Sequence, residues 1–245
     1  AKTTSGFTGA DLENLLNEAA ILAAKSGKKY ISNDDIKQSF IKVGIGTEKK
    51  SKVVGDKERK ITAYHEAGHA ILFRELPDVG PVHTISIIPT GMGAAGYTMP
   101  LPEEDYMFNT KSKMLNEIKV SLGGRIAEEL IFGDVTTGAS GDIKQATKLA
   151  KAMVMKYGMS DKLGMINYES EHEEIFIGRD IGHTKTYADD TARIIDEEIR
   201  NIIDSCYEEA KQIIMSRKDV LDKCCELLLE KEKIGYEEFE ALFND

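Results

Sequence analysis

The fold turns on one stretch of sequence, Thr62-Ala63-Tyr64-His65-Glu66-Ala67-Gly68-His69-Ala70. Apolar residues in and around it recur at spacings of three and four, which predicts a helix that begins at Lys57 and ends before Pro77. In a helix, residues four apart lie one turn apart and about 40° around the axis. His65 and His69 are therefore expected to face the same side, where both imidazoles can reach one metal ion.

The pattern His-Glu-x-x-His also places Glu66 on the same half of the helix, about 60° around the axis from His69. This arrangement is typical of zinc-dependent hydrolysis, in which two histidines bind the metal and the glutamate acts as a base. Zinc lowers the pKa of a bound water to about 7, so a nearby carboxylate can take its proton and return it to the leaving amine. We therefore predict zinc at His65 and His69, with Glu66 as the catalytic base.

A catalytic zinc typically has three protein ligands and a water, so the two histidines require one more ligand. Four acids are candidates: Glu128, Glu129, Asp134 and Asp142. The first two lie within a predicted helix and reach the metal only if that helix packs against the His65 helix, whereas Asp134 lies in a loop. Asp142 follows a glycine at a predicted helix start, where free backbone N–H groups favour an ionised carboxylate. The residues alone favour Asp142 and leave the others open.

Gly68 is unexpected inside the helix, because glycine there costs about 1 kcal/mol relative to alanine. Two explanations remain open at this point. Either another backbone segment or the substrate comes close to the metal beside Gly68, or two helices simply pack closely there.

The rest of the chain reads as mainly helical with a small sheet. Thr8 with Asp11, and Ser32 with Asp35, are capping patterns that predict the starts of two helices within the first fifty residues. Alternating apolar residues predict strands at 82–89 and 96–99, with a further one at 174–178. Three other segments are predicted to be helical: 111–132, 140–157 and nearly everything from 189 onward.

Composition excludes several classes of function. Acidic residues outnumber basic ones 42 to 32 and no dense basic stripe is present, so nucleic acid is not an expected partner. The three cysteines have no disulfide or metal-ligand spacing and are expected to be buried apolar residues in a reducing compartment. No apolar run is long enough to span a bilayer and no signal-peptide core is present, so the chain as given is expected to be soluble.

With these residues in view, the chain resembles the FtsH family of membrane-anchored, ATP-dependent zinc proteases over almost its whole length. The segment from Ser5 to Leu12 is similar to the end of the family's AAA+ helical lid. Three other segments carry the resemblance: Thr62 to Ala70, Gly123-Gly124-Arg125-Ile126-Ala127-Glu128-Glu129, and Thr137-Gly138-Ala139-Ser140-Gly141-Asp142-Ile143.

The resemblance implies a mainly α metallopeptidase domain with a small β-sheet, preceded by a helical fragment of an AAA+ lid. The expected divisions are the lid at 1–46, a linker at 47–56 and the peptidase domain at 57–245. The resemblance also implies Asp142 as the third ligand of one Zn²⁺ per chain. No Gly-x-x-x-x-Gly-Lys loop is present, so ATP and Mg²⁺ are expected only in a longer protein.

The family's partners and location are implied in the same way. They are polypeptide substrates, a homo-hexameric ring with an ATPase ring that unfolds substrates, and a membrane reached through a segment absent here. The location implied is a bacterial cell membrane with the catalytic part in the cytoplasm, or an organelle membrane. The substrates implied are membrane proteins and unstable soluble proteins.

Two questions of function remain open from the sequence. Gly96, Tyr97, Thr98 and Met99 are our candidates for holding substrate, because an exposed strand edge can pair with an extended peptide; the alternative is an ordinary sheet strand. The rivals to an endopeptidase are an assembly module with a structural zinc and an inactive scaffold. The presence of His65, Glu66 and His69 together favours the enzyme.

Overall fold

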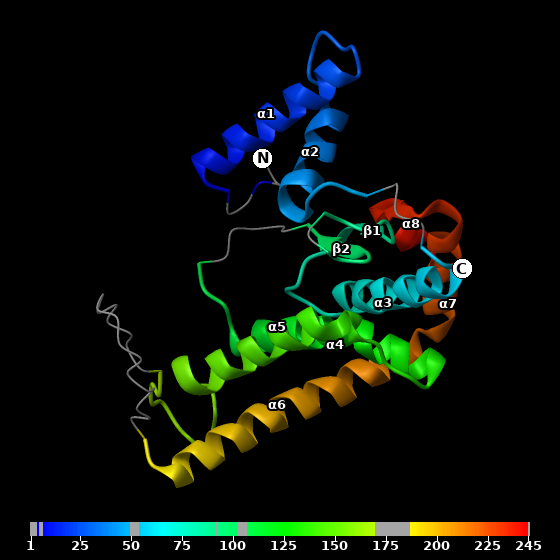
Figure 1. The fold of residues 1–245 in the computed structure, drawn as a ribbon. Helices are drawn as coiled ribbons and strands as arrows, with labels where there is room; N and C mark the ends of the chain where they lie inside the picture. Colours follow the sequence, from blue (N-terminus) through cyan, green and yellow to red (C-terminus); the bar gives the residue numbers. More distant parts are fainter. Residues whose placement is uncertain are drawn as a thin grey trace.

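Helices make up most of the computed structural model, which describes residues 4, 7–49, 54–91, 93–101, 107–169 and 187–244 (Figure 1). The predicted fold class, mainly α with a small sheet, is confirmed. The helices are α1 (Gly9–Lys25), α2 (Asn33–Ile45), α3 (Asp56–Glu75), α4 (Lys111–Phe132), α5 (Ser140–Lys151), α6 (Asp189–Ser216), α7 (Lys218–Lys231) and α8 (Tyr236–Ala241). The strands are β1 (Val82–Ser86), β2 (Tyr97–Pro100) and β3 (Lys233–Gly235).

The two N-terminal helices begin where the capping patterns predict. The Thr8 side chain accepts a hydrogen bond from the backbone of Asp11, and the Asp11 carboxylate accepts from the backbone of Thr8. Ser32 and Asp35 form the same reciprocal pair at the start of α2. Each pair satisfies backbone donors that the first helical turn leaves free, and this local chemistry fixes both starts. In Figure 1 the two helices lie together on the side of the sheet away from α3.

The sheet has the order β2-β1-β3, with both pairings antiparallel. Thr98 of β2 is opposite Ile85 of β1, which in turn is opposite Ile234 of β3. The prediction that the chain is nearly all helix from residue 189 is confirmed, with the three-residue strand β3 as an exception that it did not include. A strand of three residues carries no periodicity of its own, and it forms here because β1 offers a partner from far away in the sequence. The predicted strand at 174–178 lies outside the described residues.

A pair of glycines brings helices α3 and α4 into close contact. A Cβ atom placed on Gly68 would lie 2.4 Å from the carbonyl oxygen of Gly123, and one on Gly123 would lie 2.8 Å from the carbonyl oxygen of Gly68. No side chain fits between the two backbones. Of the two explanations for Gly68, the structure supports the second, close packing of two helices.

The main core lies between α3, α4, α6, α7 and the sheet. Its largest fully buried side chains include Ile71 on α3, Ile118 and Ile126 on α4, and Phe239 on α8. The three cysteines, Cys206, Cys224 and Cys225, are free and buried on α6 and α7, as predicted. Within the described part of the chain, no helix combines the length and the apolar character needed to cross a bilayer.

A smaller cluster joins the N-terminal helices to the sheet. Ile41 of α2, with Phe40 packed against it, contacts Tyr97 and Met99 of β2. Just after α2, Glu48 accepts hydrogen bonds from the Tyr97 hydroxyl and the Lys233 ammonium, both at 2.9 Å. One strand of the sheet is therefore fixed to the N-terminal segment by apolar and polar contacts together.

The glycine crossing generates a first prediction. We expect Gly68→Ala to lower the free energy of unfolding by about 1–2 kcal/mol, because overpacking against a rigid backbone costs up to about 3 kcal/mol and the gain in helix propensity returns only about 1 kcal/mol of it. Urea unfolding followed by circular dichroism measures this difference. Gly141→Ala is the matched control, since Gly141 lies in α5 with nothing within 4 Å of its would-be Cβ. Equal stability of the two variants would contradict the packing argument.

Candidate metal centre

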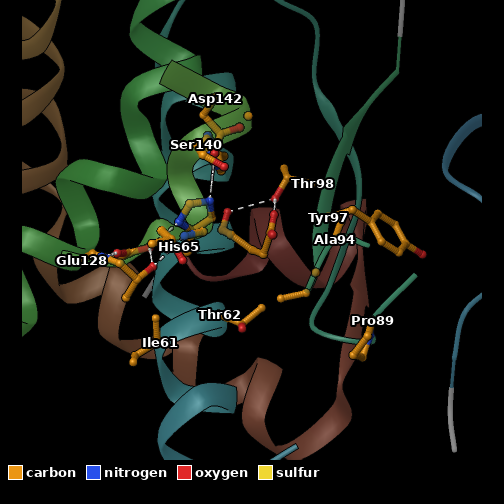
Figure 2. Close-up of a pocket in the computed structure, with 18 of the residues that line it drawn as sticks. Ile61, Thr62, His65, Pro89, Ala94, Tyr97, Thr98, Glu128, Ser140 and Asp142 are labelled. Atoms are coloured by element: carbon orange, nitrogen blue, oxygen red, sulfur yellow. Dashed lines mark hydrogen bonds and ion pairs between the residues drawn. The ribbon is translucent and has the colours of Figure 1, made fainter. Parts of the chain in front are cut away.

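Three side chains from two helices converge on one point. His65 and His69 lie one turn apart on α3, and their Nε2 atoms are 3.1 Å apart. Asp142, in the first turn of α5, places Oδ2 3.3 Å from Nε2 of His65 and 3.8 Å from Nε2 of His69. The structure thus brings together the three residues that the sequence predicts as metal ligands. Figure 2 labels two of them, His65 and Asp142.

Both imidazole rings are oriented by groups on α4 that bind their other nitrogen. Nδ1 of His69 lies 2.7 Å from the carbonyl oxygen of Val120, which can only accept, so this nitrogen carries the proton. Nδ1 of His65 lies 2.8 Å from Oε1 of Glu128, a carboxylate oxygen. With both protons on Nδ1, each Nε2 keeps a lone pair that points at the other. Such an arrangement is repulsive without a cation and is the usual preparation of histidines for a metal.

The spacing of these atoms fits zinc. Ligand atoms about 2.0–2.1 Å from a tetrahedral zinc lie about 3.3 Å from one another. The three distances in the site, 3.1, 3.3 and 3.8 Å, lie around that value. Two imidazole nitrogens and one carboxylate oxygen are also a donor set that zinc accepts in catalytic sites. The residues present therefore fit a zinc ion.

The other three acids that were candidates for the third metal ligand have different partners. Glu128 faces Nδ1 of His65, on the far side of the ring from the converging atoms, and its Oε2 accepts from the backbone of Thr136 at 2.7 Å. Glu129 accepts hydrogen bonds from Tyr207 and from a lysine on α6, and Asp134 accepts from the backbone of its own neighbour. Asp142 as a ligand stays a prediction, and the geometry favours it over these three.

The electrostatic environment of the site favours a positive charge. Burial opposes a charge on His65, but hydrogen bonds to Asp142 and Glu128 outweigh it and raise the pKa of His65 to about 10. Burial and the nearby charge of His65 lower the pKa of His69 to about 4. In the chain without metal, the pair therefore carries one proton, and one positive charge, beyond the protons on the two Nδ1 atoms. A cation bound at the Nε2 atoms would take the place of that proton.

Glu66 lies beside this point in a buried position. Burial raises the pKa of its carboxyl to about 7, against the opposing effects of His65 and of a hydrogen bond from Thr98. A carboxyl with a pKa near neutrality is suited to accept a proton and to give it up again. The Thr98 hydroxyl lies 2.8 Å from Oε2 of Glu66. The role of Glu66 as base stays a prediction that this environment favours.

The site opens into a cavity of about 960 Å³ between α3, β2 and the start of α5 (Figure 2). Of the four residues predicted to hold substrate, Gly96, Tyr97 and Thr98 line this cavity, and Met99 does not. Met99 is buried on the other side of β2, in the cluster with Ile41. The structure therefore places three of the four residues beside the candidate metal centre.

Sequence reasoning missed three features of the site. Glu128 contacts the far nitrogen of His65 rather than the converging atoms, and this contact has no local signal in the sequence. The hydrogen bond from Thr98 to Glu66 joins residues 32 positions apart, and neither segment predicts it. Gly124 lies against the His65 ring, where a Cβ would be 2.4 Å from the ring. An unexplained glycine on a neighbouring helix was the one available signal.

Comparison with known proteins agrees with this geometry. A sequence profile described as peptidase family M41 matches residues 52–242, and one described as the AAA+ lid domain matches residues 1–38. The chain belongs to peptidase family M41. Its similarity to curated M41 relatives extends over its whole length. The "ATP-dependent zinc metalloprotease FtsH" of Caldicellulosiruptor bescii is 53% identical over all of this chain and 40% of that relative.

Other M41 relatives give the same picture. FtsH 1 of a Thermoanaerobacter species is 48% identical and FtsH of Thermotoga maritima is 46% identical, each over all of this chain. Both are described as ATP-dependent zinc metalloproteases. The chain spans about 40% of the length of these curated relatives.

The M41 metal centre generates a prediction about ligands. We expect Asp142→Asn to lose bound zinc, because it removes the only negative charge among the three converging side chains. Glu128→Gln is expected to weaken zinc binding about 10- to 100-fold, the cost usual for removing a partner of a metal-bound histidine. Zinc per chain after gel filtration, and competition with a chelator, measure both effects.

Asp134→Asn is the control for this comparison, since Asp134 is exposed and, within the described part of the chain, accepts its hydrogen bond from the adjacent backbone. It should bind zinc like the unchanged chain. Full zinc in Asp142→Asn together with complete loss in Glu128→Gln would move the third ligand to Glu128.

Proposed function

We propose that this chain is the zinc endopeptidase portion of a longer ATP-dependent protease. The observation that carries the proposal is the convergence of the two Nε2 atoms and the Asp142 carboxylate, with the buried Glu66 beside them. Membership of the M41 family and the description of its relatives as zinc metalloproteases support the same reaction. The substrate class proposed is unfolded or extended polypeptide.

Each residue of the site has a separate task in the proposed reaction. His65, His69 and Asp142 would hold the zinc, which when bound polarises the scissile carbonyl and lowers the pKa of a coordinated water. Glu66 would accept a proton from the water that attacks the peptide carbonyl and deliver it to the leaving nitrogen of the cleaved peptide bond. Burial of Glu66 keeps bulk water from competing for its carboxylate.

The rival proposal, an assembly module with a structural zinc, has less support. A structural zinc normally has four protein ligands, while a catalytic one keeps a position open for water. Among the described residues the metal-binding group has three members. Glu128, a further acid that contacts His65, is engaged with the far side of that ring and with Thr136. The three-membered group beside a large cavity supports the catalytic alternative.

The remaining family features are proposals for the longer protein. We assign residues 1–46 to an AAA+ lid, 47–56 to a linker and 57–245 to the peptidase domain. The lid match at residues 1–38 and the peptidase match at 52–242 support this division. ATP-driven unfolding, a homo-hexameric ring, and anchoring to a bacterial or organelle membrane with the catalytic part in the cytoplasm belong to the same proposal.

The proposed reaction is tested by Glu66→Gln. We expect this variant to bind zinc normally and to lose at least about 100-fold in the rate of casein cleavage, because the amide keeps the shape of the side chain and cannot accept a proton. Cleavage followed by fluorescent casein, with zinc measured on the same samples, separates the two effects. His65→Ala is the contrasting variant and should lose the metal itself. Normal cleavage by Glu66→Gln would remove Glu66 from the mechanism.

We also propose that the edge strand β2 receives the substrate. Among the strands that the structure describes, β2 lies at the end of the order β2-β1-β3 and pairs with β1 alone. Gly96, just before β2, and Tyr97 and Thr98 within it line the cavity beside the candidate metal centre. An extended peptide could pair with the side of β2 away from β1 through backbone hydrogen bonds, largely independently of its sequence.

Backbone pairing is tested with peptides rather than with protein variants. A short cleavable peptide is made in versions that carry a single N-methyl group on successive backbone nitrogens. We expect a rise in KM of about tenfold at the nitrogens that pair with β2, since N-methylation removes a donor and blocks the approach of the strand. Versions that carry an extra methyl group on the side chain are the control. A KM unaffected at every position would exclude pairing with β2.

A further inference from the structure

Thr98 connects the strand β2 to the catalytic base. Side chains alternate along the strand, so Tyr97 and Met99 point toward Ile41 of α2 while Thr98 points the other way, toward α3. Its Oγ1 atom lies 2.8 Å from Oε2 of Glu66 and 3.0 Å from the backbone oxygen of the same residue. Figure 2 shows this side chain reaching from the strand toward the helix that carries His65.

We propose that Thr98 is the positioning residue of Glu66 and holds its carboxylate in place for proton transfer, an inference that rests on the proposed peptidase function. A carboxylate on a flexible side chain can adopt several rotamers, and catalysis needs it within hydrogen-bond reach of the proton it takes. Glu66 is buried, and Thr98 provides the side-chain hydrogen bond that its carboxylate has in the described structure.

A hydroxyl is suited to this task because it both donates and accepts. When Glu66 is ionised, Thr98 donates to Oε2. When Glu66 carries the proton taken from water, the carboxylic acid can donate to Oγ1, and the Thr98 proton can turn to the backbone oxygen 3.0 Å away. The same atom therefore holds Glu66 before and after the proton arrives. An ammonium at this position, which can only donate, would match the ionised state alone.

The strand is fixed close enough for this contact by its neighbours. A Cβ on Gly96 would lie 2.6 Å from the Ser86 oxygen and 3.0 Å from Cγ of Glu66, so glycine allows β2 to approach α3 closely. On the other side, the Tyr97 hydroxyl donates to Glu48 at 2.9 Å. The strand proposed to receive the substrate is thus the same strand that positions the base.

The first test compares three variants in steady-state cleavage of a fluorogenic peptide. Thr98→Val keeps the branched shape and removes the hydroxyl. We expect kcat to fall about 10- to 100-fold, the range given by loss of a hydrogen bond to a charged group, with KM and bound zinc unchanged. Thr98→Ser, which keeps the hydroxyl, should restore most of kcat. Thr147→Val is the control, because among the described residues the Thr147 hydroxyl donates to the Ile143 carbonyl of its own helix, away from Glu66.

The split between kcat and KM distinguishes positioning from a purely structural role. A substitution that only damaged the fold would also lower zinc binding or raise KM. In that case Thr98→Ser would not restore kcat. A normal kcat in Thr98→Val, or a loss that serine fails to restore, overturns the proposal.

A second test needs no activity and is decisive even if the chain does not cleave peptides. Unfolding free energies are measured for the metal-free chain, Thr98→Val, Glu66→Ala and the double variant. We expect Thr98→Val to destabilise the chain that retains Glu66 and to have little effect in the Glu66→Ala background, because only the former leaves a buried carboxylate unpaired. Additive effects of the two changes overturn the proposal. Absence of cleavage by the unchanged, zinc-loaded chain counts against the proposed function. The contact between Thr98 and Glu66 is then tested by these four unfolding free energies alone.

Discussion

The close crossing of helices α3 and α4 is the constraint on which the metal centre depends. Gly68 and Gly123 let the two backbones meet, and this contact places Gly124 directly against the His65 ring. It also places a carbonyl of α4 at Nδ1 of His69 and a carboxylate of α4 at Nδ1 of His65. The orientation of both imidazoles is therefore set by one helix contact. A bulkier residue at the crossing would displace all of these partners together.

The crossing buries several ionisable groups, and the pairing of their charges offsets the free-energy cost of that burial. Glu66, Glu128 and the two histidines are buried or nearly so, and burial of charged groups is unfavourable unless they are paired. Here Glu128 is paired with His65 and with the backbone of Thr136, while Asp142 faces both histidines. The negative charge exceeds what a single proton on the histidine pair can neutralise. A divalent cation at the Nε2 atoms would bring the cluster closer to neutrality and stabilise the fold around it.

The features that the sequence predicts are those with local causes. Capping pairs at Thr8 and Ser32, and the spacing of His65 and His69, depend on residues three or four apart, and the structure reproduces both. Non-local features were out of reach. Strand β3 exists because β1 is beside it, and the partner of Glu66 comes from a different element. Asp142 lies between these cases: its helix start is a local signal, but its approach to the histidines depends on how α5 packs.

The sheet links the N-terminal helices to the base by a continuous set of contacts. Residues Thr47 and Lys49 exchange backbone hydrogen bonds with the loop at Pro89 and Gly91, and Glu48 between them binds side chains of β2 and β3. From β2, the next contact is the hydroxyl of Thr98 on Glu66. The histidines, by contrast, are held from α4 on the other side. A movement of the N-terminal helices would thus act first on the strand that positions the base, while the metal ligands keep their separate support.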